Sequence, residues 1–404
     1  MAACHRLRYG DRRHECVVDG MSLFRCRRCL YPNTKPDIWF DEAVVCSACL
    51  AYDKRQAIDW KAREREFVDL IRSNPGKTHD VLVACSGGKD STWQIVKCLE
   101  LGLRPLAVTA TTDHLSELGR KNLDNIGNLC DHVEISPHKP ARRKISKFAL
   151  EEVGDISWCE HHLIWSIPAR EAVSREIPIV LYGECPQNEY GAGPAGSERQ
   201  ERLTPAWVHE FGGLLGLRLS DLSEILDIDP KHLELYRWPE GNVQAVFMGA
   251  YFPWDGYENA VVARKHGFTW YPGDVEGSLY GYENLDNLQT GIHDYLRFLK
   301  RGYGRAIDIA SSHIRRGRLT REQAIELVWQ RDGVRPTYYL GVSLIDILAN
   351  IGMTRAEFHL ICDRFTDLPV VKWASKLESY QFFYGLSTAP SKGDSSSQIG
   401  ASAA

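Results

Sequence analysis

The 404-residue sequence lacks any long apolar run. No segment approaches the roughly 20 consecutive apolar residues of a membrane-spanning helix, so we predict a protein without a membrane span. The arginine-rich first residues also lack the apolar stretch of a secretory signal peptide. We therefore expect a cytoplasmic location.

An excess of charge of one sign is absent as well. The chain has 49 Lys and Arg against 53 Asp and Glu, a formal net charge of -4. A protein that binds nucleic acid over much of its surface carries a positive excess, so this balance argues against a nucleic-acid partner. The first 35 residues differ, with eight Lys and Arg against three acidic residues, and they leave contact with an anionic partner open.

Disulfide bonds are not expected, although the chain holds 12 cysteines. In a reducing compartment, cysteines serve as metal ligands, reactive thiols or small core residues. Two Cys-x-x-Cys pairs, Cys26 with Cys29 and Cys46 with Cys49, are separated by sixteen residues, as in a zinc ribbon. Four thiolates close the coordination shell of the metal, so we predict a structural Zn²⁺ site. The spacing alone leaves an iron–sulfur cluster open.

A glycine-containing loop, Ser86-Gly87-Gly88-Lys89-Asp90-Ser91, lies between an apolar run and an amphipathic segment. The glycines let the backbone approach a ligand closely, and the first amides of a helix attract an anion such as phosphate. The spacing differs from the Walker pattern. It resembles instead the PP-loop of the N-type ATP pyrophosphatases, which implies ATP as a co-substrate bound by these six residues. An ordinary strand-to-helix turn is the plain alternative.

Alternating elements around this loop predict an α/β fold with a parallel sheet. We expect strands at 80–85, 104–110, 132–135 and 178–182, and helices at 90–101, 116–129, 140–153 and 161–176. The fold prediction is a PP-loop domain, similar to the adenine nucleotide α-hydrolases, with an N-terminal zinc ribbon and a helical C-terminal region. Ligands of such sheets bind beyond the carboxyl ends of the strands.

Five sections are expected along the chain. They are a flexible basic arm at 1–22, a zinc-ribbon-like module at 23–52, the PP-loop domain at 53–310, a helical region at 311–386 and a disordered tail at 387–404. Capping boxes beginning at Thr320 and Thr354 support the helical region. A connecting helix is expected within 53–74, whereas most of 200–300 shows no clear pattern of elements.

Acidic side chains gather where the predicted strands end. ATP chemistry needs Mg²⁺, which prefers oxygen ligands near the phosphates. A single acid at a turn is usually a cap or a solvated group, so the prediction depends on their convergence. The catalytic candidates are Lys89, Asp90, Glu184 and Glu189, and Thr109 and Asp113 join the loop as ATP-binding candidates.

Aromatic and basic residues between 249 and 305 suit a sugar or a nucleobase, although the same composition also makes a plain core. The substrate-binding candidates are Trp254, Tyr257, Lys265 and Arg305. Two further cysteines, Cys159 and Cys185, are either reactive thiols or small buried residues.

Together these segments resemble the N-acetyl sugar amidotransferase family, the WbpG-like enzymes of bacterial surface-polysaccharide biosynthesis. The resemblance rests on the two cysteine pairs, the loop at 86–91 and the stretches 183–191, 253–257, 265–268, 302–305 and 314–322. It covers the chain from about Phe24 to about Tyr384.

This resemblance implies a two-step reaction on a nucleotide-activated N-acetyl sugar, in lipopolysaccharide O-antigen or related glycan biosynthesis. ATP adenylates the N-acetyl oxygen with loss of pyrophosphate, and ammonia then displaces AMP to leave an acetamidino group. It also implies separate glutaminase and ammonia-channel subunits, because the sequence shows no Cys-His arrangement of a glutaminase.

Two other functions stay open. A PP-loop tRNA sulfurtransferase also combines four thiolates with an ATP pyrophosphatase fold, and the basic arm, Cys159 and Cys185 favour it. The acidic balance and the later aromatic motifs oppose it. The non-enzymatic alternative is a nucleotide-binding scaffold whose zinc ribbon docks a partner.

Overall fold

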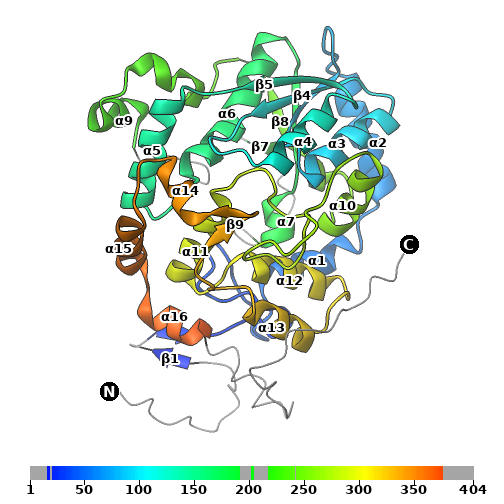
Figure 1. Ribbon diagram of the computed structural model, residues 1–404. Coiled ribbons are helices and arrows are strands. Elements are labelled where there is room, and N and C mark those ends of the chain that lie inside the picture. Colours follow the sequence, from blue (N-terminus) through cyan, green and yellow to red (C-terminus); the bar gives the residue numbers. More distant parts are fainter. Residues whose placement is uncertain (1–15, 19–20, 192–201, 204–216, 242, 376–404) are drawn as a thin grey trace.

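A computed structural model describes residues 16–18, 21–191, 202–203, 217–241 and 243–375. The predicted tail at 387–404 and most of the predicted basic arm lie outside these residues. Figure 1 shows a sheet with its covering helices in the upper part of the molecule and a mainly helical part below it.

The central sheet has six strands in the order β5-β4-β3-β6-β8-β7. Five strands are parallel, and the short edge strand β7 pairs antiparallel with β8. This arrangement confirms the predicted α/β class with a parallel sheet. The strands are β3 (Val81–Ala84), β4 (Pro105–Ala110), β5 (Asp131–Ile135), β6 (Ile179–Tyr182), β7 (Arg202–Leu203) and β8 (Gln244–Phe247).

Helices cover both faces of the sheet, because alternate residues of its strands point to opposite sides. Val81 and Val83 pack with α2, α3 and α4, whereas Leu82 packs with α5, α6 and α9. The four helices predicted with bounds, at 90–101, 116–129, 140–153 and 161–176, agree with α3, α4, α5 and α6 within three residues at every boundary. The bounds are α2 (Trp60–Arg72), α3 (Lys89–Glu100), α4 (Glu117–Ile126), α5 (Lys139–Glu152), α6 (Trp158–Ser174) and α9 (Leu219–Leu226).

The part below the sheet is built from helices with a core of their own. The capping boxes predicted at Thr320 and Thr354 are both present. Its helices are α10 (Gly256–Lys265), α11 (Thr290–Arg301), α12 (Arg305–Arg315), α13 (Arg321–Trp329), α14 (Leu344–Ala349), α15 (Arg355–Phe365) and α16 (Leu368–Ala374). A two-stranded ribbon joins β9 (Tyr338–Tyr339) to β10 (Val342–Ser343).

Smaller elements complete the chain. The N-terminal strands β1 (Cys16–Val18) and β2 (Met21–Leu23) form a hairpin, and α1 (Ser47–Arg55) follows the second cysteine pair. Strand β6 leads into α7 (Pro186–Tyr190). The 3-10 helices η2 (Pro230–Tyr236) and η3 (Met248–Ala250) flank β8.

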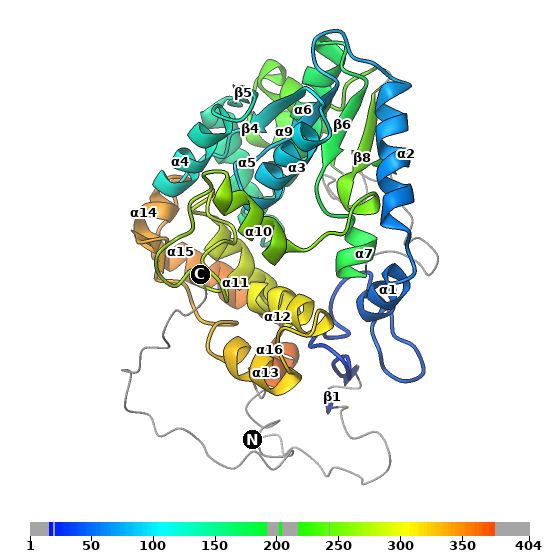
Figure 2. The same cartoon turned by 90° about the vertical axis from the view of Figure 1, so that its right-hand side faces the viewer.

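A long loop between α10 and α11 ties the helical part to the sheet. The backbone amide of Ser116 donates to the carbonyl of Asp286 at 2.9 Å, and the Ser116 hydroxyl donates to the carbonyl of Leu285. A Cβ at Gly119 would lie 2.7 Å from Cα of Asp286, so only glycine permits this approach. Figure 2 shows α10 beside α3, so the loop at 86–91 lies between the two parts of the molecule.

Candidate functional site

The loop between β3 and α3 has the backbone of an anion-binding turn. Gly87 has φ of +75°, and a Cβ there would lie 2.8 Å from Cδ2 of Leu123. The carbonyl of Gly88 accepts from Oγ of Ser91 at 3.1 Å and from Oγ1 of Thr92 at 2.9 Å. Local hydrogen bonds therefore hold the loop at the positive end of the α3 dipole.

A cavity of about 460 Å³ lies over this loop and the carboxyl ends of the neighbouring strands. We call it the loop cavity. Six residues predicted for the site line it: Ser86, Asp90, Ser91, Thr109, Glu184 and Arg305. Its volume is within the range of ordinary small-molecule sites.

A narrower cavity of about 70 Å³, which we call the side cavity, is also lined by Asp90, Glu184 and Arg305. The loop cavity and the side cavity therefore share these three side chains. Four other predicted residues line the side cavity but not the loop cavity: Lys89, Glu189, Trp254 and Tyr257. Gly87 and Gly88 line a third cavity of about 80 Å³, beside Asp286.

Lys89 is a buried ammonium between two carboxylates. Its Nζ lies 2.7 Å from Oδ2 of Asp90 and 3.0 Å from Oε2 of Glu283. Burial opposes the charged form, but the two carboxylates outweigh it and raise the pKa of Lys89. The other oxygen of Asp90 accepts from Nδ2 of Asn259 at 2.8 Å. Lys89 thus stays charged, and together with Asn259 it fixes the orientation of the Asp90 carboxylate.

Glu184 and Glu189 have opposite environments, although only four residues separate them. Glu189 is buried and forms ion pairs with Arg55 and with Arg316, the latter at 2.8 Å. Burial alone would raise the pKa of Glu189, but these guanidinium groups lower it. Glu184 has no such partner among the described residues; burial, and then the charge of Asp90, raise its pKa. Glu184, whose Oε1 accepts from the hydroxyl of Tyr190 at 3.3 Å, is therefore the carboxylate of this segment that no guanidinium of the described residues neutralises.

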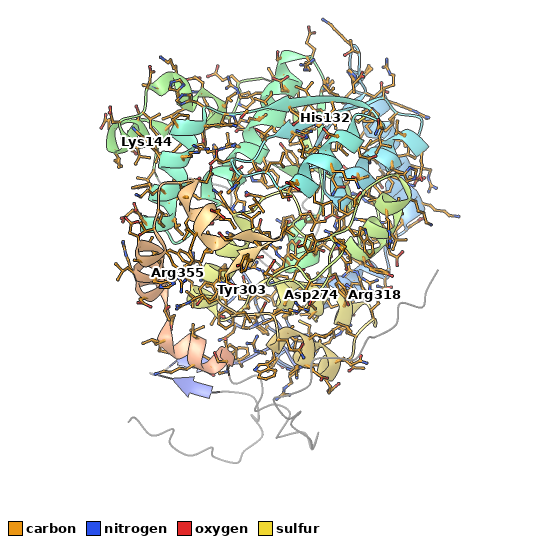
Figure 3. The ribbon with its side chains drawn as sticks, in the orientation of Figure 1. His132, Lys144, Asp274, Tyr303, Arg318 and Arg355 are labelled. Atoms are coloured by element: carbon orange, nitrogen blue, oxygen red, sulfur yellow. The ribbon has the colours of Figure 1, made fainter. Side chains whose placement is uncertain are left out.

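The aromatic candidates form one wall of the side cavity. Trp254 packs edge-to-face on Trp93 at 5.2 Å, and its carbonyl accepts from Nη2 of Arg316 at 2.7 Å. The guanidinium of Arg318, labelled in Figure 3, lies 5.1 Å from the ring of Tyr257. Trp254 thus contacts Trp93 of α3 and Arg316, and Tyr257 contacts Arg318; both arginines follow the end of α12.

Two predicted residues are not brought to this site. Asp113 lies at 3.3 Å from Nε of Arg143, its amide donates to Glu160 at 3.2 Å, and it lines none of these three cavities. Lys265 is exposed at the last turn of α10. Their ATP-binding and substrate-binding roles stay predictions.

Several residues of the site come from a stretch that sequence analysis could not assign. Glu283, Asp286 and His293 lie in or just after the loop that joins α10 to α11, and all three line cavities. The segment has no helix or strand period, yet it contains closely spaced acids and amides. This pattern could have indicated the site, because binding residues are frequent on such loops.

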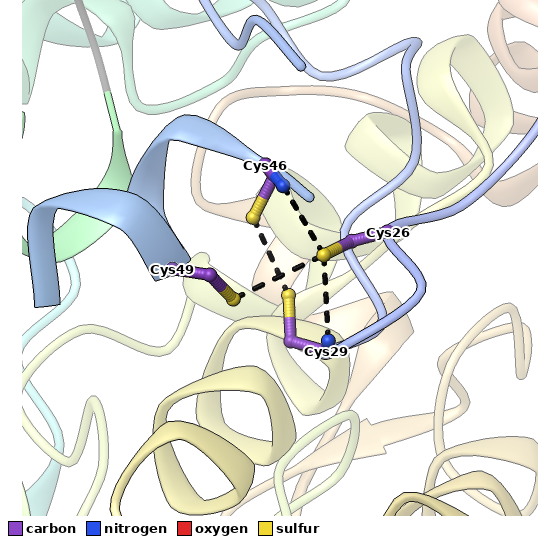
Figure 4. A group of neighbouring side chains, drawn as sticks. All are labelled: Cys26, Cys29, Cys46 and Cys49. Atoms are coloured by element: carbon purple, nitrogen blue, oxygen red, sulfur yellow. Dashed lines mark hydrogen bonds between the residues drawn. The ribbon is translucent and has the colours of Figure 1, made fainter. Parts of the chain in front are cut away.

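The four predicted metal ligands form one buried cluster (Figure 4). Sγ of Cys26 lies 3.9 Å from Sγ of Cys49, and Sγ of Cys29 lies 3.6 Å from Sγ of Cys46. Tetrahedral zinc with bonds of about 2.3 Å separates its sulfurs by about 3.8 Å, so the spacing fits the ion. The amides of Cys29 and Cys46 donate to Sγ of Cys26 at 3.4 and 3.3 Å. Four buried cysteines can thus bind a structural metal such as zinc.

The cysteine cluster is physically joined to the side cavity. Cys46 caps α1, whose last residue, Arg55, pairs with Glu189. The hydroxyl of Ser47 donates to the carbonyl of Gly191 at 2.8 Å, and Nη2 of Arg315 donates to the carbonyl of Glu189 at 2.9 Å. The helix that carries the second cysteine pair therefore positions the segment that contains both glutamates.

Cys185 is a buried thiol, and burial raises its pKa to about 11. A thiol with this pKa is protonated at neutral pH and is a weak nucleophile. The side chain of Cys159 lies outside the described residues.

The fold is an α/β fold with a parallel sheet, and a cavity lies at the carboxyl ends of its strands. Residues 266–384 match a family model described as LPS biosynthesis protein WbpG-like, C-terminal domain. This match confirms the resemblance seen in the sequence and supports the assignment of the chain to the WbpG-like family of LPS biosynthesis. A comparison with curated proteins returned no match. Among the helices of the described residues, none has the length and apolar character needed to cross a membrane.

Proposed function

We propose that this chain is an ATP-dependent amidotransferase that converts the N-acetyl group of a nucleotide-activated sugar into an acetamidino group. The observation that carries the proposal is the junction of two cavities at Asp90, Glu184 and Arg305, directly beside the loop at 86–91. A nucleotide in one cavity and an acceptor in the other would meet at these side chains. The WbpG-like match supports a biosynthetic role for this junction.

In this proposal the loop cavity takes ATP. The start of α3 favours phosphate, and Ser86 and Ser91 supply hydroxyls within this cavity. The charged Lys89 pairs with Asp90, which lines the same cavity. Asp90 and Glu184 would hold Mg²⁺, which prefers oxygen ligands. When bound, the ion neutralises charge on the phosphates during transfer.

The side cavity would take the acetamido end of the sugar against Trp254 and Tyr257. An amide oxygen is a poor leaving group, so it first attacks the α-phosphorus of ATP and releases pyrophosphate. Ammonia then attacks the activated carbon, and AMP leaves with the former amide oxygen. The chain's own contribution is to align the two substrates and to stabilise developing charge.

Ammonia would reach this chain from a separate glutaminase through a channel subunit. Nitrogen transfer is favoured over sulfur transfer because the buried Cys185 has a raised pKa and a persulfide needs an accessible thiolate. We therefore consider tRNA sulfur transfer the less favoured of the two candidate functions.

The test incubates the purified chain with ATP, ammonium chloride and a panel of UDP-linked N-acetyl sugars. We expect AMP and pyrophosphate in equal amounts and a sugar product in which NH replaces one oxygen, measured by mass spectrometry. Glutamine should replace ammonium poorly. Release of ADP and phosphate, a thioamide product or efficient use of glutamine by the chain alone would contradict the proposal.

Ser86→Ala and Asp90→Asn are the matched variants for this assay. Both residues line the loop cavity and lie outside the hydrophobic cores, so both variants should fold. We expect each to lose ATP-dependent turnover by at least about 100-fold, the scale of a lost charge-stabilising contact.

A further inference from the structure

We propose that His293 is the catalytic base of the amination step and that Asp155 positions it. This inference rests on the proposed function. Nδ1 of His293 lies 2.7 Å from Oδ1 of Asp155, and His293 lines the loop cavity. We call these two residues the Asp-His pair.

The geometry selects one tautomer of the imidazole ring. An ionised carboxylate only accepts hydrogen bonds, so Nδ1 of His293 carries the proton and Nε2 keeps its lone pair. Asp155 is held in place by the amide of Ser157, which donates to the same oxygen at 2.9 Å. Burial would raise the pKa of Asp155, but the contacts with His293 outweigh it and lower it. In the neutral ring, Nε2 of His293 is thus the atom of the pair that can accept a proton.

The two members of the pair come from different parts of the molecule. Asp155 precedes α6, on the sheet side, and His293 lies on α11, inside the matched WbpG-like domain. Packing of the two parts therefore creates the pair at the wall of the loop cavity, which is the cavity that reaches the junction at Asp90, Glu184 and Arg305. His161 lies edge-to-face to His293 at 5.2 Å and lines the same cavity.

The amination step needs a base of this kind. The lone pair of ammonia forms the new C–N bond, and the attacking nitrogen then carries one proton too many. As the C–O bond breaks, its electron pair leaves with the oxygen of AMP, and the extra proton moves from nitrogen to Nε2 of His293. The imidazolium is stabilised by Asp155 and later gives its proton to water.

Other groups around the two cavities suit this step less well. Lys89 is already protonated, and Glu189 is neutralised by Arg55 and Arg316. Glu184 lies at the junction with Asp90, where the proposal uses it for Mg²⁺. The charged and titratable neighbours of the pair are His161, Asp294, Arg297, Lys300 and Arg305.

The decisive experiment separates the two half-reactions in the full chain. His293→Asn keeps a donor near the position of Nδ1 but removes Nε2. We expect amidine formation from ammonium to fall about 10²- to 10⁴-fold, as for the loss of a general base. Sugar-dependent exchange of pyrophosphate into ATP should change by less than about threefold, because exchange reports adenylation alone. His232→Gln, at a half-buried histidine of η2 that lines none of the three cavities, is the control.

Asp155→Asn tests positioning through the separate kinetic constants. We expect kcat for amidine formation to fall, while the KM for ATP and the exchange of pyrophosphate change by less than about threefold. Asp155→Glu, which keeps a carboxylate, should recover part of the lost kcat.

Three outcomes would overturn the inference. Equal loss of exchange and amidine formation in His293→Asn would assign the pair to nucleotide binding or folding. If the unsubstituted chain makes amidine and His293→Asn makes it at the same rate, His293 is not the base, and the proposed function is unaffected. A chain that makes no amidine from any sugar of the panel would overturn both.

Discussion

Nζ of Lys89 lies 3.0 Å from Oε2 of Glu283, which joins the first turn of α3 to the WbpG-like C-terminal domain. Both side chains are almost fully buried, at 9% and 15% exposure. The matched domain therefore completes the site beside the loop at 86–91 instead of forming a separate appendage. The cysteine cluster packs against α12 and α13 of the same domain.

Substitution of Glu283 should impair ATP use through Lys89. Glu283→Gln leaves the ammonium with Asp90 alone, so Lys89 should draw Asp90 away from its other contacts. We expect kcat/KM for ATP to fall about tenfold or more, which corresponds to about 1.4 kcal/mol. Steady-state kinetics of pyrophosphate release measures it, and Glu322→Gln on the exposed face of α13 is the control. Unchanged kinetics would show that the ion pair is dispensable.

Glu184→Gln and Glu189→Gln should fail in different ways. Glu189→Gln leaves the buried guanidinium of Arg55 without its carboxylate and leaves Arg316 with Asp255 alone, so the free energy of unfolding should fall by about 3 kcal/mol. Glu184→Gln removes a carboxylate that forms no ion pair among the described residues and whose pKa is raised chiefly by burial, so stability should change little while turnover is lost. Urea unfolding and turnover of both variants measure the contrast. The reverse pattern would contradict the assignment.

Glu160 should make the stability of the protein depend on pH. Burial raises the pKa of its carboxyl to about 7, although Arg142 opposes this shift. The folded state therefore binds more protons than the unfolded state between about pH 4.5 and 7, and stability should fall as pH rises through this range. Glu160→Gln, which keeps an acceptor for the amide of Asp113, should flatten the profile by about 1–3 kcal/mol.

Urea unfolding at several pH values tests this expectation. Glu326→Gln, at an exposed position of α13, gives the comparison. Equal pH profiles for the chain with and without Glu160 would show that its carboxyl titrates normally.

Removal of the metal should reduce activity as well as stability. We predict one zinc per chain, and Cys26→Ser should lose it because three thiolates cannot close the shell. Arg55, the last residue of α1, forms an ion pair with Glu189, so loss of the metal should also displace the segment with the two glutamates. Metal analysis, thermal unfolding and turnover measure the three effects, with Cys130→Ser as the control. Iron with sulfide, or a metal-free chain of full activity, would contradict the prediction.

The sequence alone determined the α/β class, most elements around the loop and the cysteine cluster. Apolar runs and glycine positions are local signals, so the strands and helices from 81 to 182 agree with their predicted positions. Strand β8 was missed because a four-residue apolar run has no distinctive period. Two Cys-x-x-Cys pairs constrain four sulfurs to one ion whatever surrounds them, and the structure brings them together.

Only the tertiary structure decided what the individual side chains of the site do. Glu184 and Glu189 look equivalent along the chain, but Arg55 and Arg316 reach only Glu189, from positions more than 120 residues away. Asp113, which follows a strand of the sheet, lies beside Arg143 and not in the cavities. Electrostatic partners and burial depend on contacts between distant segments, and no local pattern records them.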